Sequence, residues 1–459
     1  MPKEKYDVII VGASPAGIFA ALELTRKSDL SVLIIDKGKD ISQRQHQGES
    51  LISGWGGAGA FSDGKLNFST TSGGWLREYV GVERLKQLME EVDKIYLEFG
   101  ASNQVYGVDL DEIAHIVRKA ALAGLKLLPF RIRHLGSDMA PLILQRMKKA
   151  LEEKADIRLE TEVTKILTSN DVVSGVELKS GEKIYSEYVI VAAGRAGASW
   201  LRQEAARLGI KLMANPVDIG VRVEVPAAVM QEITDLLYEP KFLFYSKSFD
   251  DRVRTFCVCP NGFVVPEYTD DIVTVNGHSY LNKKSDNTNF ALLVSTKFTE
   301  PFNDPIAYGK YIAKLANLLV GGVMVQRLAD LDEGRRSTPE RLAKSIVEPT
   351  YKDAKPGDLS FVLPARYLIG IKEMLQALDK VTPGVYSKHT LLYGVEVKFY
   401  SSRLELSNCL ETRIKNLFAI GDGAGITRGL VQASASGLIA AREILARKGI
   451  DAEKKGVGI

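Results

Sequence analysis

Residues 6–38 read YDVIIVGASPAGIFAALELTRKSDLSVLIIDKG. Residues 8–11 form a short apolar run that is typical of a strand buried on both faces. A turn containing glycine, a helical pattern and a second apolar run follow, and this second run ends at an acid, Asp36, 19 positions after Gly17. A strand, a glycine turn, a helix, a strand and a terminal acid together predict a βαβ unit that binds a dinucleotide.

Each part of this unit has a physical role in binding. Gly12 permits a tight turn after the strand, and Gly17 lets the helix pack closely on the sheet. The free N–H groups at the helix N-terminus attract a pyrophosphate, and the Asp36 carboxylate can accept hydrogen bonds from ribose hydroxyls. Ser14 replaces the middle glycine of the usual G-x-G-x-x-G pattern, which weakens the argument for a close pyrophosphate approach. The alternative is an ordinary βαβ crossover.

Length and composition limit the classes of protein to consider. The 459 residues allow two or three domains, and a net charge of +3 gives no argument for nucleic acid or an anionic membrane as a partner. We expect no signal peptide before the first strand, and no membrane span, because the longest apolar run, residues 315–325, is interrupted by Asn317 and is too short to cross a bilayer. Three cysteines without a C-x-x-C motif exclude an iron–sulfur site within the chain and favour a cytoplasmic location. Five scattered histidines give no support for a metal site.

The pattern changes several times along the chain and predicts an α/β protein with a discontinuous first domain. Residues 1–75, 131–217 and 395–459 are expected to form a Rossmann-like domain around the βαβ unit. Two amphipathic helical patterns within residues 76–130 predict a small helical insertion that acts as a cap. Short strand-like runs separated by turn residues in 218–394 predict a second, largely antiparallel β domain for the substrate.

A segment rich in glycine follows the βαβ unit. Residues 53–66 read SGWGGAGAFSDGKL, and five of these fourteen residues are glycine. Such a run lets the backbone approach a flat or anionic group closely. Trp55, Phe61 and Leu66 are interleaved with the glycines, which argues against a flexible linker because linkers are polar. We therefore expect this segment to lie against a bound cofactor.

Three separated segments agree with one known architecture. They are the βαβ unit, the small-residue strand that ends at Ala193-Gly194, and residues 412–422, which read TRIKNLFAIGD. Together they resemble the two-part FAD-binding domain of the glutathione-reductase-like superfamily. The resemblance implies that Asp422 hydrogen-bonds the ribityl chain of FAD. It also implies that the helix from Gly429 onward points its N-terminus at the flavin, where the helix dipole favours the negative charge of reduced flavin.

A narrower resemblance covers almost the whole chain. The segments GWGGAGAFSDGKL, HLGSD, TFCVCPNGFVVP, NGHSY and GDGAGITRGLVQASASG resemble the predicted FAD-dependent dehydrogenases, a microbial family of NAD(P)/FAD-dependent oxidoreductases. The resemblance implies a flavoprotein oxidoreductase with FAD and does not imply a substrate. The expected cofactor-binding residues are Gly12, Ala13, Pro15, Ala16, Gly17, Asp36, Lys37, Gly56, Gly57, Ala58, Gly59, Lys65, Leu66, Val163, Ala193, Gly194, Gly421, Asp422, Gly429, Leu430 and Val431.

Four side chains are candidates for catalysis. Lys65 lies in the segment rich in glycine and would offer a cation beside the flavin, with a solvated lysine as the alternative. Arg428 directly precedes the helix at the flavin and is a candidate for binding an anionic substrate group. His278 and Tyr280 have the spacing to share one strand face and act as proton donors, although each alone is more often structural.

Three further groups have weaker arguments. Cys257 and Cys259 share a face of an expected strand, but Cα atoms about 6.5–7 Å apart are at the limit for a disulfide, so buried core thiols are favoured over a redox pair. A cysteine near the substrate is an intermediate alternative. The adjacent Arg335 and Arg336 could bind a carboxylate or phosphate, or simply face solvent. His46 has the position of a covalent flavin histidine, but QRQHQG lacks the pattern of the fumarate-reductase-like enzymes.

Three functions remain open at this point. The leading hypothesis is an FAD-dependent oxidoreductase that acts on a small organic molecule. The first alternative is a flavin-dependent monooxygenase, although the GDGAG run differs from the usual sequence of that class. The second is a flavin-binding partner in RNA modification, for which basic stripes are missing. We expect no folded NAD(P)H domain within 218–394, so electrons would come from transiently bound NAD(P)H, an electron carrier protein or the substrate itself.

Overall fold

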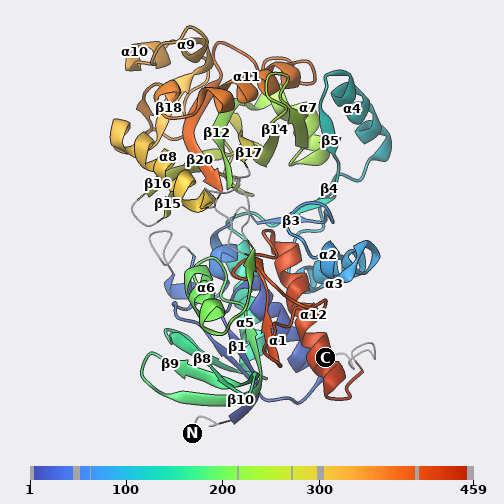
Figure 1. Cartoon of the computed structure of the whole chain (residues 1–459). Coiled ribbons are helices and arrows are strands. Elements are labelled where there is room, and N and C mark those ends of the chain that lie inside the picture. The colour runs from blue at the N-terminus through green and yellow to red at the C-terminus, as the bar shows by residue number, and fades with distance from the viewer. Residues whose placement is uncertain are drawn as a thin grey trace. The chain divides into compact units, whose positions relative to one another are not determined.

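The computed structural model describes residues 5–44, 52–62, 64–213, 217–269, 272–296, 304–398 and 403–451 (Figure 1). The chain forms two compact units. The first consists of Met1–Asn103, Arg133–Asn215 and Ser401–Ile459, and the second of Gln104–Ile132 and Pro216–Tyr400. A parallel sheet in the first unit and antiparallel sheets in the second confirm the expected α/β class.

The first unit is built around a seven-stranded sheet with the order β7-β2-β1-β10-β9-β8, and β22 pairs with β10. The elements that lie wholly or mostly in this unit are β1 (Lys5–Val11), α1 (Pro15–Lys27), β2 (Val32–Ile35), the 3-10 helices η1 (Ile41–Gln43) and η3 (Gly57–Phe61), β3 (Lys65–Asn67), α2 (Arg77–Val80), α3 (Val82–Glu98), β6 (Ile132–His134), α5 (Ala140–Glu152), β7 (Asp156–Arg158), β8 (Val163–Ser169), β9 (Val172–Leu178), β10 (Lys183–Val191), α6 (Ala198–Arg207), β11 (Leu212–Met213), β21 (Arg403–Leu404), β22 (Leu417–Ala419) and α12 (Leu430–Arg447).

The strands at the centre of this sheet are parallel, as the sequence predicts. β1 pairs in parallel with β2 and β10, β7 with β2, and β22 with β10. Both β1 and β2 consist mainly of buried β-branched and leucine side chains, because helices or loops cover both faces of a parallel sheet. The βαβ interpretation of residues 6–38 is therefore confirmed by the structure.

The alternating apolar pattern of residues 157–166 predicts one continuous strand, and this prediction is wrong. The structure has two strands here, since β7 pairs with β2 whereas β8 pairs with β9 in an antiparallel ladder. Glu160 lies between them with a left-handed φ of +50°, a conformation that breaks an extended strand. The apolar pattern of the sequence runs through this turn, which explains the error.

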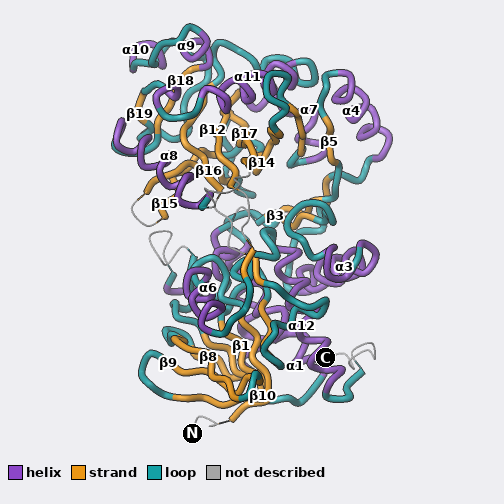
Figure 2. The backbone as a smooth tube through the Cα atoms, viewed as in Figure 1, coloured by secondary structure: helices purple, strands orange, loops and turns teal. Residues whose placement is uncertain are grey.

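Helices α1 and α12 lie side by side against the parallel sheet (Figure 2). Their contact requires Gly437, because a Cβ atom there would lie 2.2 Å from the Ala16 carbonyl oxygen and 2.8 Å from the Ala20 nitrogen. Both obstacles are backbone atoms that a rotamer change cannot move. The small residues that the sequence places on one face of this last helix thus allow two helices from opposite ends of the chain to meet.

The second unit contains an eight-stranded sheet with the order β19-β18-β20-β12-β17-β14-β13-β5 and a two-stranded ribbon of β15 and β16. Its ladders are antiparallel apart from the β18–β19 pair. The elements of this unit are β4 (Val105–Tyr106), α4 (Leu110–Leu122), β5 (Lys126–Leu128), β12 (Val217–Pro226), α7 (Ala227–Leu237), β13 (Lys241–Tyr245), β14 (Arg252–Cys259), β15 (Phe263–Thr269), β16 (Ile272–His278), β17 (Asn287–Thr296), α8 (Pro305–Val320), β18 (Met324–Arg327), α9 (Leu328–Asp332), α10 (Pro339–Leu342), β19 (Lys355–Pro356), the 3-10 helix η4 (Leu359–Phe361), α11 (Ala365–Asp379) and β20 (Leu391–Lys398).

The stretch 76–130, expected to form one helical insertion, is divided between the units. α3 packs on α12 in the first unit, where Leu85, Leu88 and Val92 join its core. α4 packs on β5 and α7 in the second unit, where Ile113 and Ile116 join a different core. Each helix is amphipathic, as the sequence predicts, but periodicity does not tell against which sheet the apolar face packs.

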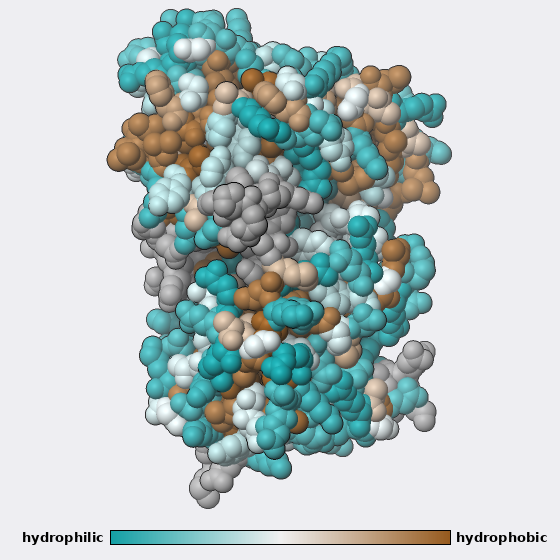
Figure 3. All heavy atoms as spheres, viewed as in Figure 1, coloured by the Kyte–Doolittle hydropathy of each residue, from teal (hydrophilic) through white to brown (hydrophobic). Residues whose placement is uncertain are grey.

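Helix α8 leaves an apolar face uncovered by the described part of the chain. Tyr311, Leu315, Leu318 and Leu319 are 73%, 37%, 80% and 49% exposed. A brown area of the space-filling view marks the region of this helix (Figure 3). Within the described ranges, no helix combines the length and the apolar character that crossing a membrane requires.

We predict that Gly437→Ala destabilises the protein by about 1–3 kcal/mol, because the new methyl group overlaps the backbone of α1. The better helix propensity of alanine, about 1 kcal/mol, opposes this effect only in part. Gly322→Ala is the matched control, since nothing lies within 4 Å of a Cβ atom there, and a change within about 0.5 kcal/mol is expected. Urea unfolding measures both, and equal midpoints for the two variants would contradict the close α1–α12 contact.

Candidate cofactor site

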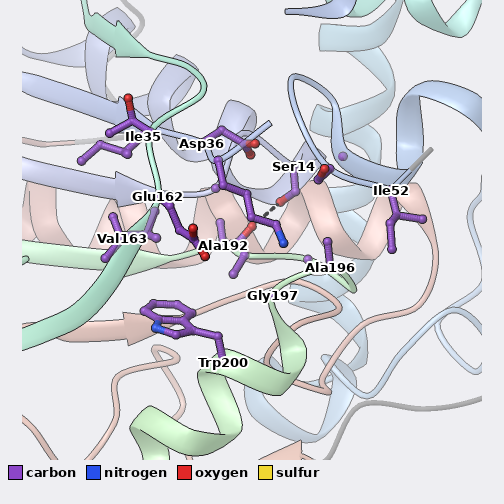
Figure 4. Close-up of a pocket in the computed structure, with 18 residues that line it drawn as sticks. Ser14, Ile35, Asp36, Ile52, Glu162, Val163, Ala192, Ala196, Gly197 and Trp200 are labelled. Carbon is purple, nitrogen blue, oxygen red and sulfur yellow. Dashed lines mark hydrogen bonds between the residues drawn. The ribbon is translucent and has the colours of Figure 1, made fainter. Parts of the chain in front are cut away.

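A pocket opens at the carboxyl ends of β1, β2 and β10 in the first unit (Figure 4). It contains about 620 Å³ of space, counting its open mouth. Crevices at this edge are the usual ligand sites of open parallel sheets. The lining residues are Val11, Gly12, Ser14, Ile35, Asp36, Lys37, Ile52, Ser53, Gly57, Thr161, Glu162, Val163, Ala192, Ala193, Gly194, Ala196, Gly197 and Trp200.

The glycine turn that forms one wall is packed directly on the end of β10. Gly12 has a φ of +107°, and a Cβ atom there would lie 2.4 Å from the Ala192 carbonyl oxygen. A Cβ atom at Gly17 would lie 2.1 Å from the Gly12 carbonyl oxygen, so glycine is needed at both ends of the turn. Ser14, the departure from the usual glycine pattern, donates a hydrogen bond of 2.8 Å to the Ala192 carbonyl. Its hydroxyl therefore fastens the turn to the neighbouring strand.

The Asp36 carboxylate binds three backbone N–H groups. Its Oδ2 accepts a hydrogen bond of 2.8 Å from Ala13, while Oδ1 accepts bonds of 2.8 Å from Gly38 and 2.9 Å from Gly54. Asp36 also lines the pocket. Because an ionised carboxylate has about four acceptor positions, roughly one position on Oδ2 remains for a ligand hydroxyl. Asp36 thus supports the loops around the pocket in addition to the ribose contact that the sequence predicts for it.

The segment rich in glycine lies against the glycine turn. Gly56 donates a backbone hydrogen bond of 2.7 Å to the Ala13 carbonyl. A Cβ atom at Gly59 would lie 2.7 Å from Pro15 and 2.9 Å from Leu430, so this glycine fits between the beginnings of α1 and α12. The close backbone approach expected from the sequence is therefore present, and the contacting groups include the start of both helices.

A buried arginine supports the same segment. Arg44 donates a hydrogen bond of 2.6 Å from Nη1 to the Trp55 carbonyl, and its guanidinium lies 4.7 Å from the Phe61 ring centroid. Burial lowers the pKa of Arg44 to about 10, although the negative charge of Asp36 acts in the opposite direction. Arg44 is a positive group that is not among the site residues predicted from the sequence.

The C-terminal segments complete this edge of the sheet. Ile420, directly after β22, donates a backbone hydrogen bond of 2.9 Å to Val191 at the end of β10. A Cβ atom at Gly423 would lie 2.7 Å from the Gly194 carbonyl oxygen. The Asp422 carboxylate is 3.3 Å from Nε of Arg195 and is 25% exposed. Asp422 therefore lies next to the small-residue end of β10.

The beginning of α12 is held by a tight loop. Arg428 and Gly429 donate backbone hydrogen bonds of 2.8 Å and 3.1 Å to the Gly73 carbonyl. The Arg428 guanidinium lies 4.1 Å from the Trp75 ring centroid, and Arg403 lies 5.8 Å from the same ring. Two cations thus flank one indole close to a helix N-terminus, where the first turn leaves backbone N–H groups without partners inside the helix.

Two family models match consecutive parts of this chain. Residues 7–222 match FAD dependent oxidoreductase, and residues 216–399 match FAD-dependent protein, C-terminal domain-like. The chain is an FAD-dependent oxidoreductase. The first match covers the βαβ unit and all residues that line the pocket, and the second covers most of the antiparallel sheet. No curated protein matches the chain.

Solved structures similar to this flavoprotein extend over nearly its whole length at low identity. Glycine oxidase from Bacillus cereus is 15% identical with a TM-score of 0.39, and the match covers 96% of this chain and 95% of that one. L-proline dehydrogenase from P. horikoshii is 14% identical with a TM-score of 0.42, and the match covers 98% and 95%. Glycine oxidase from Geobacillus kaustophilus is 14% identical with a TM-score of 0.42, and the match covers 99% and 100%.

The structure brings the predicted cofactor residues of the oxidoreductase together in the first unit. Those that line the pocket are Gly12, Asp36, Lys37, Gly57, Val163, Ala193 and Gly194. The others lie in the glycine turn, the segment rich in glycine and the C-terminal segments, and they are Ala13, Pro15, Ala16, Gly17, Gly56, Ala58, Gly59, Lys65, Leu66, Gly421, Asp422, Gly429, Leu430 and Val431. Ala16 and Gly17 are fully buried in the helix packing, which leaves them a supporting role.

Sequence reasoning missed Trp200, whose side chain lines the pocket (Figure 4). Trp200 lies in α6, and its Nε1 donates a hydrogen bond of 2.9 Å to the Thr164 carbonyl, which fixes the indole beside the start of β8. The segment AGRAGASW places it shortly after the Ala193-Gly194 end of β10. An aromatic residue in the first turns of a helix that follows such a strand is the signal that could have identified it.

The other candidates lie in the second unit or outside the described residues. The His278 ring centroid is 6.3 Å from that of Tyr280, which contacts Phe263 edge to face, so these two candidates are neighbours. Arg335 forms one ion pair of 3.0 Å with the buried Asp330 and a second ion pair with Glu333, and thus has a structural role. Arg336 is exposed, in agreement with the solvent-facing alternative. His46 lies outside the described residues.

We predict that Asp36→Asn destabilises the apoprotein, because the amide NH₂ group cannot accept a hydrogen bond from a backbone N–H. A hydrogen bond to a charged group contributes about 1.5–3 kcal/mol, and three such bonds converge on this side chain. Asp29→Asn, an exposed site on the preceding loop, is the control and is expected to change stability by less than about 0.5 kcal/mol. Denaturant unfolding of the flavin-free proteins distinguishes them, and unchanged stability of Asp36→Asn would refute the supporting role.

Proposed function

We propose that this FAD-dependent oxidoreductase binds one FAD non-covalently, with the adenosine half in the pocket at the ends of β1, β2 and β10. The observation that carries the proposal is the convergence of the glycine turn, Asp36 and Val163 on one pocket. The N-terminus of α1 adds backbone N–H groups and a partial positive charge, which suit a pyrophosphate. Because Gly12 has no side chain, a ligand can approach the backbone of the turn closely.

Different residues around the pocket suit different chemical parts of FAD. The remaining acceptor position on Asp36 suits a ribose hydroxyl. Trp200 and Val163 offer apolar surface for an adenine ring, and the backbone beside Glu162 offers hydrogen-bonding groups for its edge. Asp422, beside the end of β10, suits hydroxyl groups of the ribityl chain. These assignments agree with the order of the segments along the sheet edge.

Bound FAD would supply hydride or electron transfer, and the protein residues would position the substrate. We propose a small organic molecule as the substrate. Lys65 and Arg428 from the first unit would provide positive charge, Lys65 from a buried position and Arg428 from beside Trp75. His278 and Tyr280, whose rings are neighbours within the second unit, are proposed as proton donors.

Further parts of the proposal rest on the sequence alone. They are a cytoplasmic location and a transient NAD(P)H or an electron carrier protein as the redox partner. The alternative of a flavin-dependent monooxygenase predicts oxygen uptake that is coupled to hydroxylation of the product. A flavin-binding partner in RNA modification predicts no turnover with any small molecule. Anaerobic screening of metabolites for bleaching of the flavin tests the leading proposal, since bleaching without oxygen shows that the added metabolite itself passes electrons to the flavin, whereas a monooxygenase takes its electrons from NAD(P)H and an RNA-modification partner needs no small-molecule donor.

We predict that the purified protein is yellow and that acid precipitation releases the flavin into the supernatant. Asp422→Ala should weaken FAD binding tenfold to more than a hundredfold, because a charge-assisted hydrogen bond contributes about 1.5–3 kcal/mol. Asp332→Ala, which removes an aspartate paired with Lys372 in the second unit, is the control and should keep full affinity. Equilibrium dialysis gives both affinities. Colour that stays with the acid pellet would refute non-covalent binding, and equal affinities would refute the role of Asp422.

We predict weak or slow bleaching when the oxidised protein is mixed anaerobically with NADH or NADPH. The reason is that the sequence shows no second strand–glycine–helix unit within 218–394 to hold a nicotinamide nucleotide permanently. Stopped-flow absorbance over a range of nucleotide concentrations measures the apparent dissociation constant, which should be high. Fast reduction that saturates at about micromolar nucleotide would contradict the absence of a dedicated site and would identify NAD(P)H as the physiological reductant.

A further inference from the structure

Two cysteines of the second unit lie at an irregularity of β14. The ladder between β14 and β17 pairs Phe256 with Ala291 and Cys259 with Asn289, and the register shifts between these pairs. Cys257 has a φ of +46°, a left-handed conformation that non-glycine residues rarely adopt. The expectation of a regular strand, on which the redox pair was disfavoured, is therefore wrong. The segment is a bulge, and bulges redirect side chains and free the backbone from the ladder.

The bulge brings the two sulfur atoms together. The Sγ atoms of Cys257 and Cys259 are 3.9 Å apart, and neither cysteine is in a disulfide. A disulfide needs a separation of about 2.05 Å, so the sulfurs must approach by roughly another 1.9 Å. Cys257 and Val258 fall at the register shift between β14 and β17, where a bulge locally disrupts the ladder.

The two thiols differ in accessibility. Cys257 is half-buried, whereas Cys259 is 0% exposed. Intramolecular thiol–disulfide exchange needs one cysteine that external disulfides can reach and a second cysteine that then attacks the first. The accessible Cys257 and the buried Cys259 suit these two roles. A pair of ordinary core thiols would have no reason to include a strained residue, because a left-handed conformation costs about 1–2 kcal/mol for a side chain with a Cβ atom.

Polar groups that suit a thiolate surround the pair. Arg222, fully buried, donates a hydrogen bond of 3.1 Å to the Cys257 carbonyl and another of 2.7 Å to Asn289 Oδ1, and it forms a two-fold ion pair with Glu396. Burial alone would lower the pKa of Arg222, but Glu396 and the sulfurs of Cys257 and Cys259 raise it above its ordinary value. Lys398 adds a second buried cation, paired with Glu396 at 3.2 Å.

Asn289 is a second, independent observation beside the pair. It is fully buried, and its Nδ2 has no hydrogen-bond partner within the described residues. Because Asn289 is opposite Cys259 in the ladder, the two side chains are neighbours on one face of the sheet. A buried N–H donor is costly when it has no acceptor, and a thiolate sulfur beside it is an acceptor.

We propose that Cys257 and Cys259 form a redox-active dithiol that exchanges with low-molecular-weight disulfides. The Cys257 thiolate attacks one sulfur of the disulfide RSSR, which breaks the S–S bond, forms a mixed disulfide and releases one RS⁻. Cys259 then loses its proton and attacks the Cys257 sulfur, which forms the Cys257–Cys259 bond and releases the second RS⁻. The protein gives up two electrons and two protons, and RSSR becomes two RSH. This inference does not depend on the proposed FAD site.

Equilibration of the full-length protein with its flavin in mixtures of oxidised and reduced glutathione tests the proposal. Acid quenching, alkylation of free thiols and mass spectrometry of the fragment that contains both cysteines give the redox state. We expect a species two hydrogens lighter than the dithiol, without glutathione, that appears in one two-electron transition. Cys409, the third free cysteine, is the internal control, because it has no second cysteine beside it among the described residues and can only take up glutathione. A fragment that stays doubly alkylated, or that carries glutathione alone, would overturn the proposal.

Two variants test the order of attack. Cys259→Ser should trap a glutathione adduct on Cys257, whereas Cys257→Ser should leave the buried Cys259 without an adduct. The reverse pattern would overturn the assignment of Cys257 as the attacking residue. Flavin absorbance and the unfolding midpoint show whether each variant is folded, and the measurement on the unmodified protein decides the proposal even if a variant is not.

Discussion

The first unit depends on one backbone contact, the packing of the Gly12 turn on the end of β10 at Ala192. No side chain fits between these segments, and Ser14 fastens them with a hydrogen bond. The other parts of the site are added to this contact in layers. Gly56 bonds to the turn from one direction, and Gly423 packs on the continuation of β10 from another. Close-packed main-chain segments thus fix the shape of this sheet edge in the protein without a ligand.

Asp36 links this edge to the loops that follow it. A carboxylate that binds three N–H groups holds the glycine turn, the end of β2 and the segment rich in glycine in one arrangement. Part of the entropy of ordering these loops is thus lost during folding and not during ligand binding, which favours affinity. The same side chain therefore has two roles, since it organises the empty protein and keeps one acceptor position at the pocket.

Local sequence patterns predict much of the fold of the first unit. The features that the sequence did not predict depend on contacts between segments that are far apart in the chain. The strand, turn and helix of residues 6–38 follow from apolar periodicity and glycine spacing, which are properties of the sequence itself. The hydrogen bond that the Gly54 N–H donates to Asp36 could not be predicted, because backbone donors leave no trace in side-chain patterns. Trp200 was missed because its position beside the pocket depends on how α6 packs on the rest of the first unit. The bulge at Cys257 was missed because its residues are ordinary strand formers, and the cross-strand register alone reveals it.

The contribution of β22 and α12 to the first unit has a consequence for synthesis on the ribosome. β22 lies against β10 and α12 against α1, so the first unit lacks a strand and a helix until residues 417–447 have been made. The 185 residues of the second unit from Pro216 to Tyr400 are translated in the meantime, which takes roughly 10–40 s at 5–20 residues per second. During this interval the apolar face of α1 that later packs on α12 is without its partner. The first unit therefore stays incomplete for this interval, and the second unit has time to fold first.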